Sequence, residues 1–364
     1  MPSRFSQSVS IGFDGQIFRR QRRGGISRYF RELALNLRAA GAEVLMAEER
    51  QGCWPWSGHL PWRRADVVHA TFYGGGPYRL QSHQRLVSSL FDMTPERHPE
   101  HFFLPALRSP HANKPGWLEV SDLIISISAA SADDLAFFQP TLRTPLRVIH
   151  LATAIDRLVP QPVEALEGRR FWLMVGKRHA YKNGLTLLRA LSLLHGGDGD
   201  RGRRDQPLLV CAGGGPWRAE ERRWIHGQGL EDAVLQLAAT DPVLAWLYRH
   251  AEAVLVPSLA EGFSLPLIEA LACDTPVVAS DLEVHREVGQ SFATLLPALN
   301  ARVWSELLAA AGQGTLPRPS HRLGGERYAR LRRHFAPERL VQDHLEAYGS
   351  TTDRPSPRIR GRRG

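Results

Sequence analysis

One segment, residues 254–281, constrains the fold of this chain more than any other. It reads VLVPSLAEGFSLPLIEALACDTPVVASD, which is an apolar run, a loop that contains Gly262, a helical stretch and a second apolar run. Apolar strands that alternate with helices are typical of a parallel sheet flanked by helices. The segment therefore predicts an α/β architecture.

Two acids in this segment suggest what it binds. Glu261 lies in the loop and Glu269 lies eight positions later, inside the predicted helix. A strand that delivers a loop onto a helix N-terminus is how α/β proteins hold phosphorylated ligands. A carboxylate in such a loop can also bind a neutral group rich in hydroxyls. The combination points to a nucleotide-sugar.

The sequence of the segment resembles the Glu-x7-Glu region of the family-4 retaining glycosyltransferases, which have the GT-B fold. EGFSLPLIEALACDTPVVASD differs from the usual motif of that family mainly at Ser264 and Asp274, where Gly is common. The resemblance implies that Glu261 binds hydroxyls of the donor sugar and that Glu269 binds the ribose of the nucleotide. An ordinary solvated acid is the alternative for each residue taken singly.

Sugar transfer also requires positive groups where negative charge grows on the departing diphosphate. The loop supplies backbone amides for this purpose at Gly262, Phe263, Ser264 and Leu265, ahead of a helix that is expected to begin near Pro266. The helix dipole adds about 0.3–1 kcal/mol for an anion at its N-terminus. We expect these four residues to contact the nucleotide-sugar.

A second element, VGKRHAYKNGLTLLRAL (175–191), carries candidate cations. Members of the family hold an Arg-Lys pair before the helix and another cation just after the strand. Here Lys182 matches the Lys, whereas Tyr181 stands where Arg is usual. Lys177 or Arg178 is expected to supply the second cation, and a solvated basic turn is the alternative.

A third element, FDGQIFRRQRRGGISRYFREL (13–33), contains the pair Gly24-Gly25 before a predicted helix. Glycines at a helix N-terminus allow a close approach to a diphosphate. The GGISRYF wording resembles the N-terminal domain of bacterial family-4 enzymes that build surface polysaccharides, several of them mannosyltransferases. The arginines at 19, 20, 22 and 23 would serve an acceptor or a membrane surface, or form a flexible basic loop.

The acceptor side of the site departs from the family. Many members carry a His-Asp pair in the first domain, and here Asp92 matches while Phe91 replaces the His. Asp92, or His69 in DVVHATF, would then orient the acceptor. His69 lies near the C-terminal end of a predicted strand, and a packed core histidine is the alternative.

No metal site or cofactor is expected. Asp198-Gly199-Asp200 is a literal DxD, but it lies in the low-complexity loop GGDGDRGRRDQ (196–206) with nothing rigid behind it. His98 and His101 are three apart, and a metal site is not expected there because no acid or third ligand is identified as accompanying them. Cys53, Cys211 and Cys273 are scattered without metal-ligand spacing, which indicates idle thiols.

Composition limits the class of protein. The 364 residues suit two domains, and 43% hydrophobic residues are typical of a globular chain. Apolar runs are too short for a membrane span, and the N-terminus lacks a signal peptide, so a cytoplasmic protein is expected. The formal charge of +9 fits either an arginine-rich proteome or attraction to anionic lipids and diphosphates. The arginines are too dispersed for a nucleic-acid-binding module.

Taken together, these patterns predict an α/β protein of GT-B fold, with two Rossmann-like doubly wound domains that face across a cleft and a C-terminal helix that returns to the first domain. The expected parts are an acceptor domain (1–155), a nucleotide-sugar domain (171–322), helices that pack back on the first domain (323–349) and a disordered basic tail (350–364). Residues 153–170 are interpreted as a linker.

The predicted activity is retaining, metal-independent transfer of a hexose, with mannose from GDP-mannose as the first choice on resemblance. The predicted acceptor is a glycan or a lipid-linked oligosaccharide of surface polysaccharide synthesis, reached by peripheral contact with the inner face of the cell membrane. No residue stands out as a covalent nucleophile, which favours transfer on a single face of the sugar. A nucleotide-sugar epimerase or hydrolase of the same fold, and a donor-binding partner subunit without activity, remain as alternatives.

Overall fold

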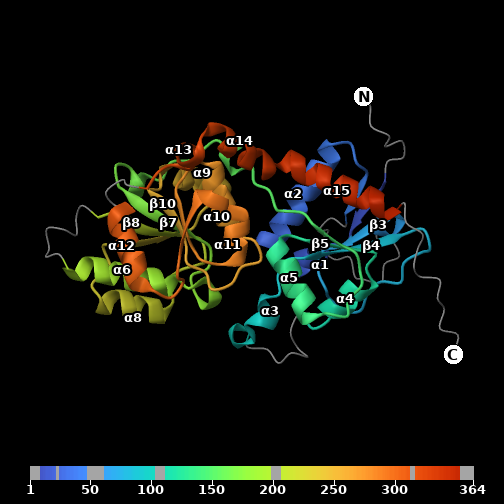
Figure 1. The fold of residues 1–364 in the computed structure, drawn as a ribbon, viewed down its shortest axis with the longest axis horizontal. Coiled ribbons are helices and arrows are strands. Elements are labelled where there is room, and N and C mark those ends of the chain that lie inside the picture. The colour runs from blue at the N-terminus through green and yellow to red at the C-terminus, as the bar shows by residue number, and fades with distance from the viewer. Residues whose placement is uncertain are drawn as a thin grey trace. The chain divides into compact units, whose positions relative to one another are not determined.

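The computed structural model describes residues 9–21, 24–46, 61–102, 111–197, 206–311 and 316–352. The chain divides into two compact units. The first consists of Met1–Leu151 with Pro337–Gly364, and the second of Ala152–Ala336. Each unit is an α/β structure built on one sheet (Figure 1). The Asp198-Gly199-Asp200 motif, Arg22, Arg23, Cys53 and residues 353–364 of the predicted tail lie outside the described residues.

The first unit contains a six-stranded parallel sheet in the order β2-β1-β3-β4-β5-β6. The reversal of strand order lies between β1 and β3, where Phe13 pairs with His69. The strands are β1 (Ile11–Phe13), β2 (Val44–Met46), β3 (Val67–Ala70), β4 (Arg85–Leu90), β5 (Leu123–Ser126) and β6 (Leu146–Val148). Its helices are α1 (Gln16–Arg20), α2 (Gly25–Ala39), α3 (Thr94–Arg97), α4 (Lys114–Val120), α5 (Ala129–Phe138) and α15 (Pro337–Thr352), with 3-10 turns η1 (Pro61–Arg64) and η2 (Pro99–His101).

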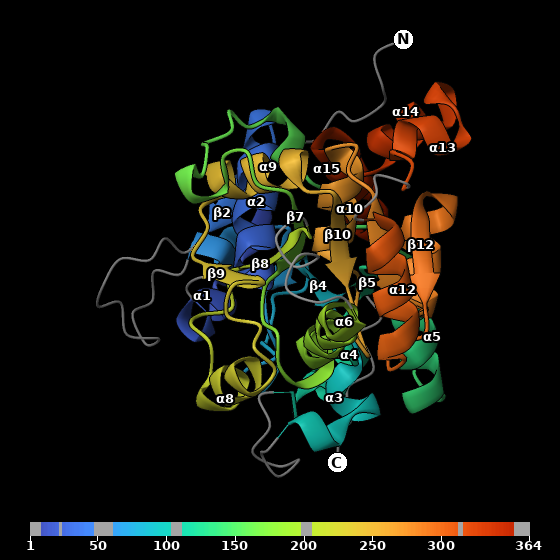
Figure 2. The ribbon, with the colours of Figure 1, turned by 90° about the vertical axis from the view of Figure 1, so that its left-hand side faces the viewer.

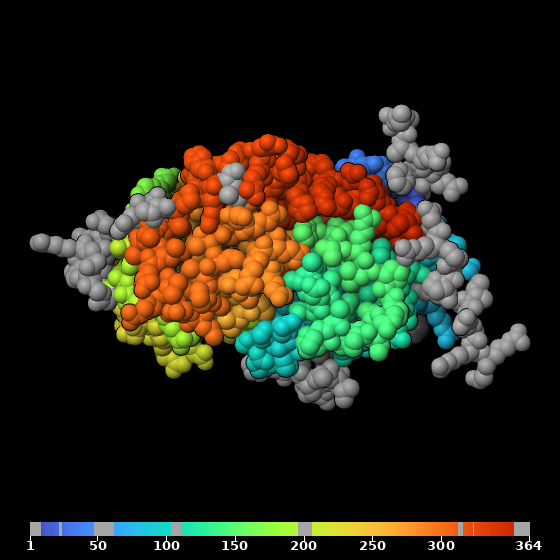
Figure 3. Space-filling view, in the orientation of Figure 1, coloured from blue at the N-terminus to red at the C-terminus, as the bar shows by residue number. Residues whose placement is uncertain are grey.

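α15, the last helix among the described residues, belongs to this first unit, as predicted. α15 lies along α2 (Figure 1). The hydroxyl of Tyr29 is 2.8 Å from Nε2 of His344, and the hydroxyl of Tyr348 is 2.8 Å from Nδ1 of His69. Figure 3 shows one side of α15, in red, at the molecular surface. Ser128 caps α5 by accepting a hydrogen bond from the amide of Ser131 at 3.0 Å.

The second unit contains a six-stranded parallel sheet in the order β12-β11-β10-β7-β8-β9. Figure 2 shows β9, β8, β7, β10 and β12 in this succession across the sheet. The strands are β7 (Phe171–Val175), β8 (Leu208–Ala212), β9 (Val234–Leu237), β10 (Ala253–Val256), β11 (Val277–Ser280) and β12 (Ala293–Leu296). The helices are α6 (Gly184–Gly197), α8 (Ala219–Gly227), α9 (Asp241–His250), α10 (Leu265–Ala272), α11 (Glu283–Gly289), α12 (Ala301–Ala311), α13 (Pro319–Leu323) and α14 (Gly325–His334), with 3-10 turns η4 (Ile155–Arg157), η5 (Glu164–Leu166), η6 (Ala180–Lys182) and η7 (Gln290–Phe292).

The core of the second unit fixes the strands that carry the candidate site. Trp172 on β7 and Trp304 on α12 are fully buried in one cluster with Leu187 and Leu191 of α6. α6 and α12 pack side by side, while α10 packs against α9 and α11 (Figure 1). Because β7 and β10 are central strands buried on both faces, the loops at their carboxyl ends are held in place.

The structure draws the boundaries of the units differently from the sequence analysis. Residues 153–170, interpreted as a linker, belong to the second unit, where Ile155 and Leu166 are buried. α14, expected to return to the first domain, instead packs on the second unit, because the hydroxyl of Tyr328 donates to the carbonyl of Leu271 at 2.7 Å. The return to the first unit begins at Pro337.

The length and composition of the helices show whether any of them could cross a membrane. Across the part of the chain that the structure describes, no helix combines the length and the apolar character that a membrane crossing requires.

Candidate functional site

The candidate site lies where the strand order of the second sheet reverses. The order is β12-β11-β10-β7-β8-β9, so β7 and β10 are neighbours although they are far apart in sequence. Ligands of open parallel sheets bind outside the carboxyl ends of the strands at such a switch point. The loop after β7 contains Lys182, and the loop after β10 contains Glu261.

The structure brings these two predicted residues into direct contact. Nζ of Lys182 donates to both carboxylate oxygens of Glu261, at 2.6 and 2.8 Å. The hydroxyl of Ser258 donates to Oε1 of Glu261 at 2.7 Å. The side chain of Glu261 is 9% exposed and that of Lys182 is 24% exposed, so the pair is mostly shielded from water but reachable through the lysine.

Backbone contacts hold the two loops together. The amide of Leu259 donates to the carbonyl of Tyr181 at 2.7 Å. The side-chain amide of Asn183 donates to the carbonyl of Pro257 at 2.9 Å, and Asn183 itself has φ of 54° at the end of η6. Asparagine tolerates this left-handed conformation better than most residues. Hydrogen bonds between the two loops therefore hold Lys182 and Glu261 in position.

Electrostatics keep Glu261 ionised. Burial acts to raise the pKa of its carboxyl, but the nearby Lys182 ammonium and the hydrogen bonds from Lys182 and Ser258 act more strongly in the opposite direction, so the pKa falls below its usual range. A lowered carboxyl pKa means a full negative charge at neutral pH. Such a carboxylate only accepts hydrogen bonds, so it can bind the hydroxyl groups of a ligand.

The loop after Glu261 leads into the N-terminus of α10. Ser264, which precedes this helix, has φ of 85° and ψ of 73°, a conformation that favours glycine. Its hydroxyl is buried and has no hydrogen-bond partner among the described residues. Strain of this kind, together with an unsatisfied buried group, clusters at functional sites. Ser264 therefore strengthens the prediction that this loop end meets a ligand.

Two neighbouring predicted residues have less accessible side chains. Phe263 is 2% exposed and its ring packs against Phe335, so only its backbone is available to a ligand. Glu269 is 4% exposed, and Oε2 of Glu269 accepts a hydrogen bond of 2.6 Å from the hydroxyl of Tyr248. Glu269 is thus a buried, hydrogen-bonded acid, and not the solvated helical acid that was the alternative. Its role as a ribose ligand stays a prediction.

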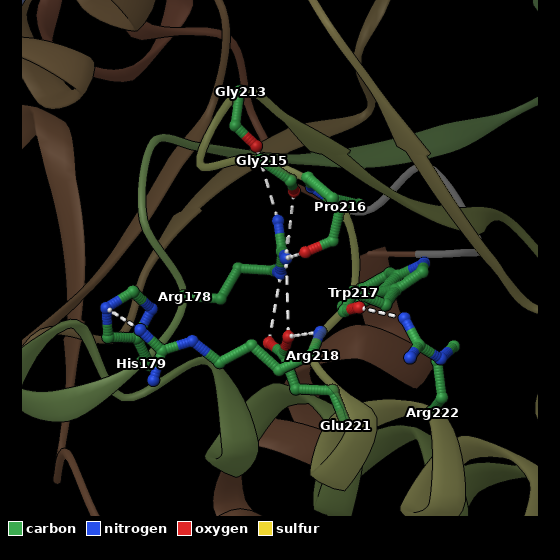
Figure 4. A network of polar contacts seen from close by, with 9 residues as sticks. All are labelled: Arg178, His179, Gly213, Gly215, Pro216, Trp217, Arg218, Glu221 and Arg222. Carbon is green, nitrogen blue, oxygen red and sulfur yellow. Dashed lines mark hydrogen bonds and ion pairs between the residues drawn. The ribbon is translucent and has the colours of Figure 1, made fainter.

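Arg178 does not have the role that the sequence suggested. It is 4% exposed, and all three of its guanidinium nitrogens donate within the second unit (Figure 4). Its partners are the carboxylate of Glu221 at 3.0 and 3.3 Å and the carbonyls of Gly213, Gly215 and Pro216 at 3.1–3.2 Å. The guanidinium also lies 4.3 Å from the centre of the Trp217 ring. Arg178 is a structural residue rather than a phosphate ligand.

The contacts of Arg178 fix the loop that follows β8. Gly213, Gly214 and Gly215 have φ between 71° and 79°, which glycine alone adopts readily. A Cβ on Gly214 would lie 2.3 Å from the carbonyl oxygen of Gly176, so the loops after β7 and β8 touch through their backbones. Lys177, next to this contact, is exposed and remains the available second cation of the predicted pair.

The structure also corrects the prediction that His69 orients the acceptor. It is fully buried in the first unit, and its Nδ1 and Nε2 lie 2.8 Å from the hydroxyls of Tyr348 and Ser89. The rings of Phe13 and Phe30 flank it at 5.6 and 5.3 Å. Because both ring nitrogens are bonded inside the unit, His69 is a packed core residue and does not orient an acceptor. Burial, followed by the charge of His344, lowers its pKa.

Asp92 follows β4, and the glycine pair follows α1, both in the first unit. Oδ1 of Asp92 accepts a hydrogen bond from the amide of Thr94 at 2.9 Å, and its side chain is half-buried. Phe91, where the family has His, packs against Tyr29 and Phe30. Gly24 and Gly25 lie at the start of α2, as predicted. The contacts proposed for Asp92 and the glycines with an acceptor or a diphosphate stay predictions.

His285 is a further residue near Glu261, and no sequence motif pointed to it. This residue of α11 is fully buried, and its Nδ1 donates to the carbonyl of Ser280 at 2.7 Å. The hydroxyl of Ser280 donates in turn to the carbonyl of Ser258, the residue that bonds Glu261. Nε2 of His285 has no hydrogen-bond partner among the described residues. The only sequence signal was a histidine in the helix that follows the strand VVAS, one strand beyond the recognised loop.

His285 is neutral in this environment. Burial lowers its pKa, and this effect and the positive charge of Lys182 outweigh the influences of Glu261, Ser280 and Asp281, which raise it. Because Nδ1 carries the proton given to Ser280, Nε2 presents a lone pair. An unsatisfied acceptor of this kind is expected where a ligand donates.

The cysteines and the histidine pair were predicted to play no part. Burial raises the pKa of Cys211 and of Cys273 to about 12, so these two thiols are unreactive. His98 and His101, however, do have an acid beside them, since Glu100 lies within 3.2 Å of His98 and 3.8 Å of His101.

Comparison with known proteins shows what the chain is similar to. Residues 158–311 match the family model of glycosyl transferases group 1. D-inositol 3-phosphate glycosyltransferase of Jonesia denitrificans is 32% identical over 190 residues, 49% of this chain and 42% of that protein. The serotype-specific mannosyltransferase WbdA of Escherichia coli is 28% identical over 255 residues, 62% of this chain and 30% of that protein. The chain thus spans less than half the length of these two relatives.

One further relative matches over most of its length. The O-antigen chain mannosyltransferase B of Escherichia coli is 25% identical over 280 residues, 69% of this chain and 71% of that protein.

Solved structures show the same fold over nearly the whole chain. Sucrose-phosphate synthase from Thermosynechococcus elongatus aligns with a TM-score of 0.69 at 18% identity, over 94% of this chain and 98% of that one. Anabaena HepE, solved with UDP and glucose, aligns with a TM-score of 0.65 at 18% identity, over 94% and 100%. With its two parallel sheets and these structural matches, the chain has the GT-B fold, and its residues 158–311 are similar to the glycosyl transferases of group 1.

Proposed function

We propose that the protein is a retaining glycosyltransferase that moves a hexose from a nucleotide-diphosphate sugar to a glycan or lipid-linked oligosaccharide. The observation that carries the proposal is the Lys182–Glu261 pair at the switch point of the second sheet. In this pair, Lys182 can bind a diphosphate and Glu261 can accept hydrogen bonds from sugar hydroxyls, and both residues are held by the same two loops. The names of two relatives, WbdA and O-antigen chain mannosyltransferase B, favour mannose and surface polysaccharide synthesis.

Each partner of the pair has a distinct task in this proposal. Without a ligand, Lys182 neutralises Glu261. When the donor enters, the diphosphate competes for the Lys182 ammonium, and the carboxylate of Glu261 is released to accept hydrogen bonds from sugar hydroxyls. As the glycosidic bond breaks, negative charge grows on the leaving diphosphate, where Lys182, Lys177 and the amides at the start of α10 stabilise it. These groups make a metal ion unnecessary for the transfer step.

The donor class is the first thing to measure. Thermal shifts with UDP, GDP and ADP and with their sugars should reveal one nucleotide that raises the melting temperature by several degrees, since a ligand at 100 times its Kd stabilises by about 2.7 kcal/mol. We expect GDP and GDP-mannose to give this shift. HepE was solved with UDP and UDP-glucose, so UDP is the competing outcome. The absence of a shift with any of these nucleotides would contradict the proposed function.

Lys182→Met should weaken the affinity for the nucleoside diphosphate by about 10- to 100-fold, because a charge-assisted hydrogen bond to an anion contributes about 1.5–3 kcal/mol. Isothermal titration with the nucleotide found in the screen measures the effect. Arg189→Met removes a positive charge from the exposed side of α6 and serves as the control, with unchanged affinity. Equal affinities for the Lys182 variant and the wild type would remove Lys182 from the site.

His285→Asn should weaken binding of the nucleotide-sugar about 10-fold while leaving the nucleoside diphosphate unaffected. The lone pair on Nε2 can accept a hydrogen bond from a sugar hydroxyl, whereas phosphate oxygens offer only acceptors. The Asn amide can still donate to the carbonyl of Ser280, so the fold is retained. His250→Asn is the matched control, because Nδ1 of His250 also donates to a carbonyl, that of Trp246 at 2.8 Å. Equal losses for both ligands would contradict this role.

The two alternatives are separated by an acceptor. An epimerase or hydrolase would convert the donor without one, and an inactive partner subunit would bind the donor and convert nothing. Phe91 and Tyr181 are the departures from the family that raise the second alternative. In this structure Nζ of Lys182 lies 5.4 Å from the centre of the Tyr181 ring, so Tyr181 supports the lysine through a cation–π contact.

A further inference from the structure

A second cluster of polar side chains lies in the first unit, apart from the residues of the candidate site. His98, Glu100 and His101 follow α3, after the carboxyl end of β4. One ligand atom from each of the three lies within 4.8 Å of the others. Figure 3 shows the cyan segment that contains α3 and η2 at the molecular surface. The cluster is therefore open to ions from solution.

The distances within this His98–Glu100–His101 cluster suit a small divalent metal. Oε1 of Glu100 lies 3.2 Å from Nδ1 of His98 and 3.8 Å from Nε2 of His101. Zinc binds nitrogen and oxygen at about 2.0–2.2 Å in tetrahedral geometry, which sets its ligands about 3.4 Å apart. The two separations that involve Glu100 lie on both sides of this value, and all three ligand atoms lie within 4.8 Å of one another, so side-chain rotations are needed to bring them to one ion.

The backbone that carries the three residues is restricted in conformation. Pro99 restricts its own φ, and η2 is closed by hydrogen bonds from the amides of His101 and Phe102 to the carbonyls of His98 and Pro99, at 3.1 and 3.0 Å. The two imidazole rings are nearly parallel, with an interplanar angle of 27° and centres 5.9 Å apart. His98 and His101 are 27% and 23% exposed, so both rings are largely held by the protein, whereas Glu100 at 61% can rotate.

The ligand set determines the class of metal. Two imidazoles and one carboxylate favour Zn²⁺ and its neighbours in the first transition series, whereas Mg²⁺ and Ca²⁺ prefer oxygen ligands alone. Three protein ligands leave a fourth position for water or an anionic oxygen. We propose that His98, Glu100 and His101 form a binding site for a zinc-type divalent metal. The site is independent of the proposed function, because Lys182 and Glu261 lie in the second unit.

The test is metal titration of the full chain, free of any histidine tag and stripped with a chelator. The wild type should bind one equivalent of Zn²⁺ at this site with a Kd in the micromolar range or below. His98→Ala, His101→Ala and Glu100→Gln should each weaken this binding at least 10-fold. All three side chains are partly or largely exposed, and unchanged circular dichroism spectra would show that the variants fold.

The control for this test is another histidine–glutamate contact. Nδ1 of His226 lies 2.6 Å from Oε1 of Glu231, and both side chains are exposed. Among the described residues, this pair is not part of any group of three potential metal ligands. His226→Ala should bind Zn²⁺ as the wild type does. Failure of the wild type to bind Zn²⁺, variants of the cluster that bind it unchanged, or displacement of Zn²⁺ by millimolar Mg²⁺ would each overturn the proposal.

Discussion

Glu261→Gln should lower the rate of sugar transfer by about 100-fold or more, with little change in the affinity for the nucleoside diphosphate. The carboxylate is ionised, mostly buried and held by Lys182 and Ser258, so it is preorganised to accept hydrogen bonds from two sugar hydroxyls. Hydrogen bonds to a charged group contribute about 1.5–3 kcal/mol, and a 100-fold loss corresponds to about 2.7 kcal/mol. The measurement is kcat/KM with the labelled donor.

The choice of glutamine makes this result specific. Gln keeps the shape of Glu261 and can still accept from Ser258, so a loss of activity cannot be assigned to misfolding if the melting temperature is unchanged. Glu252→Gln is the matched control, because Glu252 pairs with Arg170 at 2.8 Å at the amino end of β10, away from the loop of Glu261. Full activity of Glu261→Gln, or an equal loss in Glu252→Gln, would contradict the assignment.

Arg178→Ala should lower the free energy of unfolding of the second unit by about 3–5 kcal/mol. The substitution leaves Glu221, which is largely buried, without its partner and leaves three backbone carbonyls without a donor (Figure 4). Arg178→Lys should recover only part of the loss, because an ammonium lacks the planar fork that reaches all four partners. Denaturant unfolding followed by tryptophan fluorescence measures the change.

The control for Arg178 is an arginine in a surface ion pair. Arg170 pairs with Glu252, and its side chain is 44% exposed, so Arg170→Ala should change the stability by less than about 1 kcal/mol. If Arg178→Ala were as stable as Arg170→Ala, the network would not hold the loop after β8. Arg178 would then be available as the phosphate ligand that the sequence suggested.

The segment 254–281 allowed much of the second unit to be predicted. Its alternation of strand, loop and helix defines β10, α10 and β11, and the short apolar runs elsewhere define most of the remaining strands. β9 has a weaker sequence signal than these strands. The sequence of β9, VLQL, is only partly buried and carries Gln236, so it lacks the continuous apolar run of a central strand.

The roles of individual basic and histidine residues were harder to predict, because these depend on contacts distant in sequence. Arg178 and Lys182 stand in the same basic turn, yet Arg178 is neutralised by Glu221 on α8 while Lys182 meets Glu261. His69 lies in an apolar strand, and Tyr348, 279 residues away, bonds its ring. Local pattern gives the type of residue, whereas only the packed structure shows which polar groups are already satisfied.

The most direct test of the account is transfer of labelled sugar from the nucleotide-sugar identified by thermal shift to a lipid extract, with wild-type protein and Glu261→Gln side by side. We predict a labelled glycolipid with the wild type and a rate at least 100-fold lower with the variant. Donor consumption without a labelled product, or equal rates for the two proteins, would contradict the claim that the Lys182–Glu261 pair is the donor site of a glycosyltransferase.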